Sequence, residues 1–396
     1  MLPFEYENST RLVFGPGRRR EIGCLLAPYL AKGEKLLLHY GGGSIRKNGV
    51  YADVTASLKE AGIAYTELGG VQPNPRLSLV REGISLCRRE HVTMILAVGG
   101  GSVIDSAKAI ALGSMAQDDV WDFYTGAADP EAALPVAAIL TLPASGSESS
   151  VSTVITDDEK TGRKLGRNHR LNRPVFSVID PEVFLSLPRS QMANGVCDMM
   201  SHIMERYFTN TPHTDVTDGM CEGILRAILQ NARRLLQDAH DLSAWSELGF
   251  AGALAHNGLL GLGREEDWAS HRIEHELSAA YDIAHGAGLA VVTPAWMKYT
   301  APEHLSMFAQ FAVNVMGVSG ALRDTGDVAM EGIQKLTEFF LELGLPVTLP
   351  ALGIDGARLE ELASAAVTAP LGGPRTLGGL KKLDRADVLA ILKLAL

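Results

Sequence analysis

The chain has little that is typical of a secreted or membrane-bound protein. Its 396 residues include only four cysteines, which are widely spaced and form no CxxC pair. This favours a reducing compartment over a disulfide framework. No run of about 18 uncharged apolar residues occurs, and the N-terminus has no basic segment followed by an apolar one. The sequence predicts a cytoplasmic protein that does not bind a membrane.

Positive charge is also scarce. The formal net charge is −10, and the longest basic run is the RRR of residues 18–20. Nucleic acids and anionic membranes attract surfaces rich in Lys and Arg, so this balance argues against both as partners. A hydrophobic content of 46% with 21% charged residues is typical of a soluble protein with sizeable cores.

The first half of the chain alternates strand-like and helix-like segments. The strand-like runs are TRLVFGPG, KLLLHYGGGS, AYTELGG, MILAVGGGS, LPVAAILTLP and PVFSVIDP, and helical patterns such as NPRLSLVREGISLCRREH separate them. Alternation of this kind predicts an α/β domain with a doubly wound, mostly parallel sheet.

Proline use changes near residue 190. Eleven of the 18 prolines lie at or before Pro188, and none lies between Pro212 and Pro294, where helix-forming runs dominate. We therefore predict an α/β domain over residues 1–189 and an all-helical domain over residues 190–396.

Two of the predicted strands end in triple glycines, at residues 41–43 and 99–101. Glycine lets the backbone approach a phosphate, and the N-terminus of a following helix offers unpaired N–H groups. Neither loop matches GxGxxG or the Walker pattern, so each alone is weak evidence, and Gly-Gly turns are common. A third segment, TLPASGSESS, supplies hydroxyls after another strand, and all three loops should lie at the carboxyl edge of the sheet.

The first glycine loop carries no Asp or Glu that would bind a ribose 2′-hydroxyl and repel a 2′-phosphate. Ser44, Arg46 and Lys47 stand there instead. This indicates a dinucleotide cofactor with NADP(H) preferred over NAD(H), and makes Arg46 a candidate cofactor residue.

Asp198 and His202 lie four residues apart in an apolar run, so on a helix they share one face. Further on, His271, His275 and His285 fall within fifteen residues; the first two share a helical face and the third precedes a glycine-rich turn. One carboxylate with three or four imidazoles suits Fe(II), Zn(II), Ni(II) or Co(II). Unrelated core histidines remain the alternative.

These segments resemble the iron-containing (group III) alcohol dehydrogenases, in particular the NADP-dependent butanol dehydrogenase and broad-range aldehyde reductase branch. The resemblance covers nearly the whole chain. Its most specific parts are GGGSVIDSAKAIA, TLPASGSES, NGVCDMMSHIMERY and DWASHRIEHELSAAYDIAHGAGLAVVTPAWM. It implies a dehydroquinate synthase-like fold, a homodimer that pairs near the N-terminal strand, and hydride transfer between NADP(H) and primary alcohols or aldehydes, with a divalent metal polarising the substrate oxygen.

Carried over by position, the resemblance implies four metal ligands, Asp198, His202, His271 and His285, with Fe(II) the first expectation and Zn(II) or another transition ion the alternative. His275 matches a histidine near cofactor and substrate that is not a ligand, and we interpret it as a catalytic proton relay, with bound water and the cofactor ribose as the alternative route. The implied cofactor residues are Gly41, Gly42, Gly43, Ser44, Gly99, Gly100, Gly101, Ser102, Asp105, Thr141, Ser145, Ser147 and Lys164. Asp105 as a structural helix-start residue and Lys164 as a solvated lysine remain open.

Two other functions remain as alternatives. A metalloenzyme like dehydroquinate synthase or glycerol dehydrogenase, acting on a polyol or phosphorylated substrate, would use the same fold. A non-catalytic nucleotide-binding or metal-storage protein would show no turnover of any aldehyde.

Overall fold

The computed structural model describes residues 1–396, which form two compact units. The sheet unit comprises Glu7–Leu187 and His240–Asn257, and the helical unit comprises Met1–Tyr6, Pro188–Ala239 and Gly258–Leu396. None of the helices combines the length and the apolar character needed to cross a lipid bilayer.

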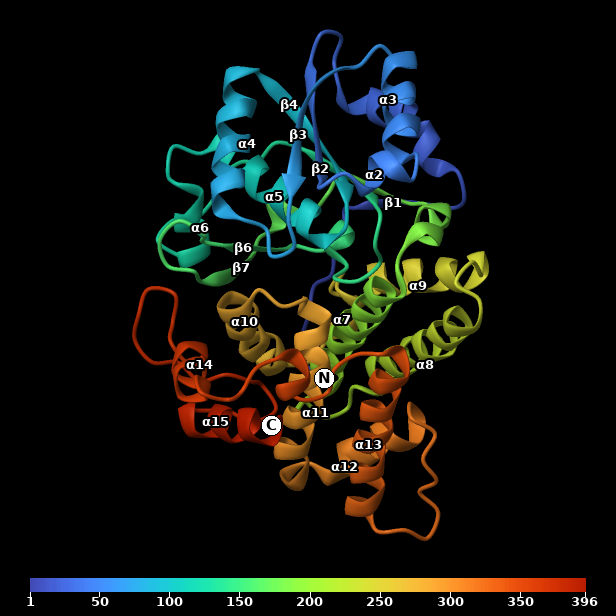
Figure 1. Cartoon of the computed structure of the whole chain (residues 1–396), viewed down its shortest axis with the longest axis vertical. Helices are drawn as coiled ribbons and strands as arrows, with labels where there is room; N and C mark the ends of the chain where they lie inside the picture. Colours follow the sequence, from blue (N-terminus) through green and yellow to red (C-terminus); the bar gives the residue numbers. More distant parts are fainter. The chain divides into compact units, whose positions relative to one another are not determined.

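The sheet unit is built on six strands in the order β1-β8-β5-β4-β2-β3, and every neighbouring pair is parallel (Figure 1). The strands are β1 (Arg11–Phe14), β2 (Lys35–Gly41), β3 (Ala64–Val71), β4 (Val92–Gly99), β5 (Val136–Leu140) and β8 (Phe176–Ile179). Central strands of a parallel sheet are covered on both faces, which explains why β5 is buried throughout. The predicted doubly wound α/β fold is confirmed.

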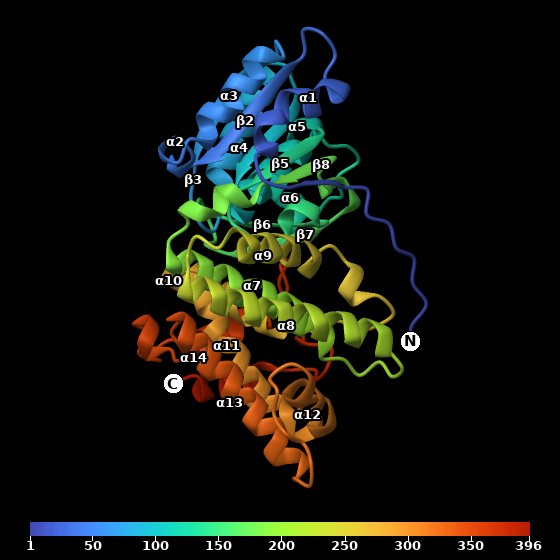
Figure 2. The same ribbon diagram turned by 90° about the vertical axis from the view of Figure 1, so that its right-hand side faces the viewer.

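Helices connect and cover these strands. They are α1 (Ile22–Leu26), α2 (Ser44–Lys47), α3 (Val50–Glu60), α4 (Leu77–Arg89), α5 (Gly101–Met115), α6 (Val120–Thr125) and α9 (Leu242–Ala255). Helices α4 and α5 pack against each other, as do α1 and α3 (Figure 2). Helix α5 begins directly after the second glycine loop and packs against β4 and β5.

An antiparallel hairpin, β6 (Ser152–Thr156) and β7 (Lys164–Asn168), was not predicted. Its turn is held by Asp157, whose carboxylate accepts hydrogen bonds from the backbone N–H groups of Glu159, Lys160 and Thr161. A turn of this type is encoded by one Asp and leaves no apolar periodicity in the sequence.

The observed division of the chain differs from the predicted one in two segments. Met1–Tyr6 belongs to the helical unit, and the segment that contains α9 belongs to the sheet unit. Trp245 of α9 packs on Phe184, with ring centroids 5.9 Å apart, and the carbonyl of Ala253 accepts a hydrogen bond of 2.7 Å from Ser149 Oγ. Composition assigned α9 to the helical domain, because a helix that packs back onto the sheet unit has the same sequence pattern as one that stays in the helical unit.

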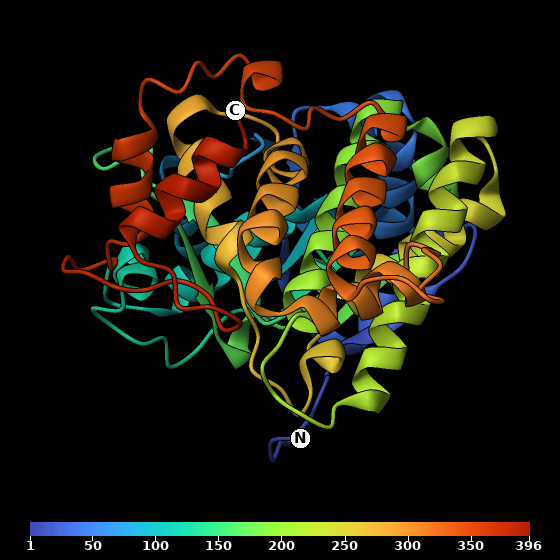
Figure 3. The same cartoon turned by 90° about the horizontal axis from the view of Figure 1, so that it is seen from below.

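The helical unit consists of eight helices. They are α7 (Arg189–Tyr207), α8 (Asp215–Gln237), α10 (Ala269–Tyr281), α11 (His285–Thr300), α12 (Leu305–Asn314), α13 (Thr325–Leu343), α14 (Leu359–Ala366) and α15 (Arg385–Leu394). The orange helices in Figure 3, α12 and α13, pack against each other, and α11 packs against α7 and α10. Phe208, Trp296 and Phe308 form an aromatic core with ring centroids 4.5 to 6.2 Å apart.

Candidate metal centre and nucleotide loops

The centre of the helical unit is a buried helix, α7, that carries several polar side chains, Asp198 and His202 among them. Every residue of α7 from Gly195 to Tyr207 is buried, including Asp198 and His202. Buried polar groups need partners, and a buried carboxylate needs a compensating charge. Helices α10 and α11 pack against α7 and bring His271 and His285 to it.

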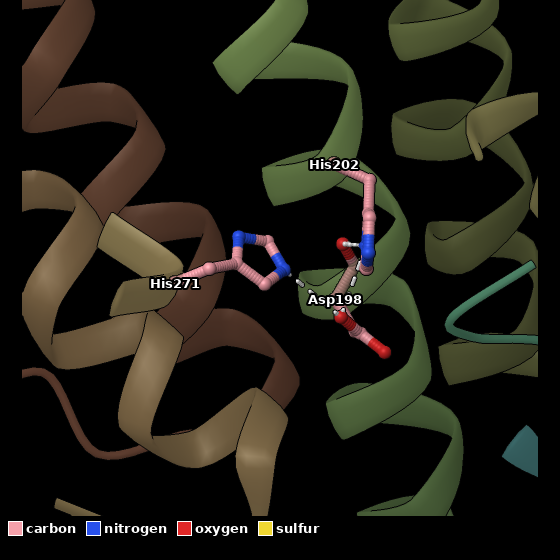
Figure 4. Close-up of side chains that lie close together, drawn as sticks. All are labelled: Asp198, His202 and His271. Carbon is pink, nitrogen blue, oxygen red and sulfur yellow. Dashed lines mark hydrogen bonds and ion pairs between the residues drawn. The ribbon is translucent and has the colours of Figure 1, made fainter. Parts of the chain in front are cut away.

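Three of the four predicted metal ligands, the histidines, converge on one carboxylate oxygen of the fourth, Asp198. Oδ1 of Asp198 lies 3.1 Å from His202 Nδ1 and 3.7 Å from Nε2 of both His271 and His285. Figure 4 shows Asp198 and His202 on α7 with His271 reaching toward them from a neighbouring helix. The ligating atoms of Asp198, His202 and His271 all lie within 4.8 Å of one another.

Each of the three histidines is fixed by a second partner at Nδ1. His202 Nδ1 meets the backbone carbonyl of Asp198 at 2.9 Å, His271 Nδ1 meets Glu205, and His285 Nδ1 meets Glu274. Carbonyl and carboxylate oxygens only accept, so Nδ1 carries the proton and donates it. For His271 and His285 this leaves Nε2, the atom that faces Oδ1 of Asp198, as a lone-pair donor, and proteins orient metal-binding histidines in this way. His202 faces Oδ1 with the same Nδ1 that meets the carbonyl.

The two outer carboxylates are themselves held in place. Glu205 Oε1 accepts a 3.0 Å hydrogen bond from the backbone N–H of His271, and Glu274 Oε1 accepts one from the hydroxyl of Ser278. Glu205 and Glu274 were not singled out in the sequence. The available signal was helical spacing, because each lies three residues after a ligand, His202 and His271, on the same helix.

The electrostatics favour a cation. Burial works against the charged form of Asp198, but the neighbouring His202, His271 and His285 hold the pKa of its carboxyl well below its ordinary value. Burial also opposes the charged form of His271, yet Glu205 and Asp198 raise the pKa of His271 to about 9. Three carboxylates, those of Asp198, Glu205 and Glu274, thus surround three imidazoles in a buried site.

Two buried atoms of the site have no hydrogen-bond partner, Oδ1 of Asp198 and Nε2 of His271. Native proteins rarely leave such atoms unsatisfied without an ion or water. Ligands of a tetrahedral ion with bonds of about 2.1 Å stand roughly 3.4 Å apart. The observed 3.7 Å separations from Asp198 to His271 and His285 are close to this spacing. The donor set therefore fits a divalent transition ion.

His275 lies at the edge of this cluster. Its ring centroid is 5.7 Å from that of His285, and it groups with Glu274 and His285 within 4.8 Å. Trp268 closes another side, with its ring 5.7 Å from His202 and 5.3 Å from His271 and with Arg206 stacked on it. The structure thus brings all five predicted residues of the helical unit together.

The three predicted nucleotide loops lie side by side in the sheet unit. They follow β2, β4 and β5, which are neighbours in the sheet, and the backbone N–H of Thr141 donates to the carbonyl of Gly99 at 3.0 Å. Parallel strands place these ends at one edge, the ordinary ligand edge of such sheets.

The glycines of the two triple-glycine loops have different surroundings. A Cβ added at Gly42 or Gly43 would meet nothing within 4 Å, and Gly43 has a φ of 112°, which favours glycine. A Cβ at Gly99 would lie 2.3 Å from Val103, and one at Gly101 would lie 2.2 Å from Ser145 Oγ. The first loop therefore leaves open space above its backbone, whereas the second needs glycine for internal packing.

Arg46 is engaged by residues outside its loop. Its Nη2 donates to Tyr40 at 2.7 Å and to Glu67 at 3.1 Å, and its guanidinium lies 3.9 Å from the ring centre of Tyr51. The sequence showed no acid in the first glycine loop, but Glu67 of the neighbouring strand β3 supplies one beside Arg46.

Asp105 is occupied by the serine-rich segment. Its Oδ1 accepts from Ser147 Oγ at 2.5 Å, and its Oδ2 accepts from the backbone N–H of Val154 at 2.9 Å. Burial raises the pKa of Asp105 despite these contacts and the nearby Lys108 and Lys164. These contacts tie Asp105 to the serine-rich segment and to β6, and no acidic residue lies in the first turn of α5, so they do not support the helix-start alternative. Lys164 is buried at the start of β7 and so is no solvated loop lysine.

Comparison with known proteins gives two family matches that together span most of the chain. Residues 9–181 match the model for iron-containing alcohol dehydrogenase, and residues 192–396 match the C-terminal model of the Fe-containing alcohol dehydrogenase family.

Individual relatives agree over the full length. The chain is 42% identical over 394 residues to NADH-dependent butanol dehydrogenase A of Clostridium acetobutylicum, covering 99% of each chain. It is 34% identical over 363 residues to the NADPH-dependent aldehyde reductase YqhD of Escherichia coli (strain K12), covering 91% of each. The crystal structure of NADH-dependent butanol dehydrogenase A from Thermotoga maritima superposes with a TM-score of 0.95 at 40% identity, covering 100% of this chain and 99% of that one. The chain belongs to the iron-containing alcohol dehydrogenase family and is an alcohol and aldehyde oxidoreductase.

Proposed function

We propose that this chain interconverts primary alcohols and aldehydes by hydride transfer with a nicotinamide dinucleotide, using a divalent ion held by Asp198, His202, His271 and His285. The observation that carries the proposal is the convergence of three imidazoles on Oδ1 of Asp198. His271 and His285 are fixed at Nδ1 by Glu205 and Glu274, which leaves their Nε2 atoms for an ion beside this carboxylate.

The ion supplies Lewis-acid chemistry, which lowers the energy of negative charge on a substrate oxygen. The chain's own residues set the conditions for it. One carboxylate and three neutral imidazoles leave a bound divalent ion with net positive charge, and the buried surroundings keep the local dielectric low. We expect Fe(II) first, with Zn(II) or another transition ion as the alternative, because this ligand set does not select one ion by itself.

His275 is proposed as the group that passes a proton to the product alkoxide. It lies next to His285 and is not needed to complete the four-ligand set, and imidazole suits proton transfer near neutral pH. His275→Ala should lower turnover while metal content stays at the wild-type level. Loss of the metal in this variant would place His275 among the ligands instead.

The nucleotide is proposed to bind at the loops after β2, β4 and β5, with NADP(H) preferred over NAD(H). The open space above Gly42 and Gly43 and the nearby guanidinium of Arg46 support this preference. Glu67 opposes it, because its carboxylate already pairs with Arg46 and would repel a 2′-phosphate. The names of relatives point both ways, since one is NADH-dependent and another NADPH-dependent. The ratio of kcat/KM for the two cofactors decides the matter.

A homodimer is proposed through the exposed edge of the sheet unit. Strand β1 is the last strand of the sheet, and Phe14 at its end is 43% exposed beside Phe250, which is 47% exposed. An unpaired edge strand with exposed aromatic side chains is a ready pairing surface. Light scattering that detects only monomers at micromolar concentration would remove this proposal.

The whole proposal is tested by initial rates with butanal. NADPH and NADH oxidation should be followed on protein loaded with Fe(II), on protein loaded with Zn(II), and on protein treated with a chelator. We expect turnover that disappears on chelation and returns with at least one metal. Folded protein that binds nucleotide but reduces no aldehyde with any metal would favour a lyase-type or non-catalytic function.

A further inference from the structure

We propose that Lys108 is a positioning residue for nucleotide binding, whose buried ammonium group holds residues 147–152 in the conformation that receives the cofactor. Lys108 acts through this segment rather than as a ligand of the cofactor. The inference rests on the proposed function, because it requires a nucleotide at the loops of the sheet unit, and it adds a residue to which that proposal gives no role.

The ammonium group is enclosed by the serine-rich segment. Lys108 lies on α5, is 1% exposed, and donates to three backbone carbonyls, those of Ser147 at 2.6 Å, Ser152 at 2.8 Å and Ser150 at 3.2 Å. It also meets the hydroxyls of Ser147 at 2.8 Å and Ser150 at 3.4 Å. The three N–H groups of one ammonium group thus have five oxygen acceptors in the segment, which fixes the segment around the Nζ atom of Lys108.

Asp105 holds the same segment from one helical turn earlier. It accepts from the hydroxyl of Ser147, which in turn accepts from Lys108, and from the backbone N–H of Val154. Helix α5 begins at Gly101 in the second glycine loop. One helix therefore fixes the geometry of two neighbouring loops, the one at its start and the serine-rich one packed along it.

The charge itself is the feature that calls for an explanation. Burial of an ammonium group costs free energy. Other donors, such as backbone N–H groups in a different turn, could satisfy the same carbonyl oxygens without a lysine. All the hydrogen-bond partners of Lys108 are neutral oxygens. Asp105 and Glu148 are the acidic groups near it, and neither accepts a hydrogen bond from it. The ammonium group is therefore committed to the oxygens of the segment that it holds.

The test compares Lys108→Met, which keeps the length and removes the charge, with Lys108→Arg, which keeps the charge. The full metal-loaded chain is titrated with NADPH and NADH by calorimetry, and KM and kcat are measured with butanal. We expect Lys108→Met to weaken nucleotide binding about tenfold or more. Its kcat at saturating nucleotide should fall by less than about threefold, and Lys108→Arg should recover part of the affinity.

Hydrogen exchange separates positioning from general stability. In Lys108→Met without nucleotide, exchange should rise in the peptide that covers residues 147–152, while the peptide of α7 exchanges as in the wild type. Lys59→Met, at an exposed position of α3, is the matched control and should behave as the wild type. If Lys108→Met does not fold, Lys108→Gln keeps a hydrogen-bonding end without charge and takes its place.

Wild-type nucleotide affinity in a Lys108→Met protein that is merely less stable would overturn the inference and leave the proposed function standing. Absence of nucleotide binding in the wild-type protein would overturn the proposed function itself, and this inference with it. Unchanged exchange in residues 147–152 together with weaker binding would also contradict positioning, because the lysine would then act without ordering the segment.

Discussion

The metal centre and the nucleotide loops hold their ligands by different means. In the helical unit the ligating groups are side chains, and the buried carboxylates of Glu205 and Glu274 fix two of them, His271 and His285. In the sheet unit the first glycine loop offers bare backbone with open space above it, and the supporting contacts lie behind the loops at Asp105 and Lys108. Affinity in the helical unit should therefore depend on individual side chains, and affinity in the sheet unit on backbone placement.

The largest effect is expected from removing a ligand. Asp198→Asn removes the negative charge on which three histidines converge. It should abolish stoichiometric metal binding and lower kcat/KM by roughly a thousandfold or more. Elemental analysis and butanal kinetics measure both. His213→Asn, an exposed histidine with a φ of 60° that Asn tolerates, is the control and should keep its metal. A fully active, metal-loaded Asp198→Asn would contradict the ligand assignment.

A smaller effect is expected from the two carboxylates that hold the ligand histidines in place. Glu205→Gln and Glu274→Gln keep the size of the side chain but weaken the hold on His271 and His285. Metal affinity should fall by about 10- to 100-fold in each, with the fold retained. Competition titration against a chromophoric chelator measures this. Glu342→Gln at the exposed surface of α13 serves as the control. Equal metal affinities in all three variants would contradict a role of Glu205 and Glu274 in holding the ligands.

The glycine loops should separate binding from stability. Gly42→Ala adds a methyl group in open space, so it should leave the melting temperature unchanged and weaken nucleotide binding about tenfold by filling the space above the loop. Gly101→Ala forces a clash with Ser145 and should cost about 1–3 kcal/mol of stability. Calorimetry and urea unfolding test the pair. The opposite pattern would show that the first loop is structural.

The smallest effect concerns the pH dependence of stability. Glu148 is 1% exposed, and neither carboxylate oxygen has a hydrogen-bond partner in another residue. Burial raises the pKa of Glu148 from 4.5 to about 7. The unfolded carboxyl ionises near pH 4.5 while the folded one stays protonated until about pH 7, so folding loses up to about 3 kcal/mol as pH rises through this window.

Glu148→Gln cannot ionise and should therefore be more stable than the wild type at pH 8, by up to about 3 kcal/mol, with the difference shrinking towards pH 5. Urea unfolding at both pH values measures this, with Glu60→Gln at the exposed end of α3 as the control. If the difference in unfolding free energy between Glu148→Gln and the wild type is the same at pH 5 and pH 8, Glu148 is ionised in the folded protein.

Sequence patterns predicted the features that repeat at fixed spacing. Six strand-like runs bounded by Gly, Pro or Ser predicted the six strands of the sheet, and the central strand β5 is apolar and buried throughout. Asp198 and His202, four residues apart on α7, came from helical spacing in the same way. The expectation that α10 and α11 meet α7 came from the family resemblance, because no local sequence pattern indicates which helices pack together.

Contacts between distant segments were the part that sequence did not reveal. Lys108 read as an ordinary residue of an apolar helix, although it supports a loop some 40 residues later. Glu67 lay outside the glycine loop that it faces through Arg46. The return of α9 to the first unit was missed for the same reason. In each case the tertiary fold determines which residues come into contact, and the local sequence around each residue does not indicate its contact partner.

The most direct test of the central claim is a titration of metal-free protein with Co(II), followed by visible absorption. The four-ligand site predicts ligand-field bands that saturate at one equivalent per chain, persist in His275→Ala and disappear in His271→Ala. Absence of a saturable band in the folded wild-type protein, or equal bands in both histidine variants, would contradict the metal centre described here.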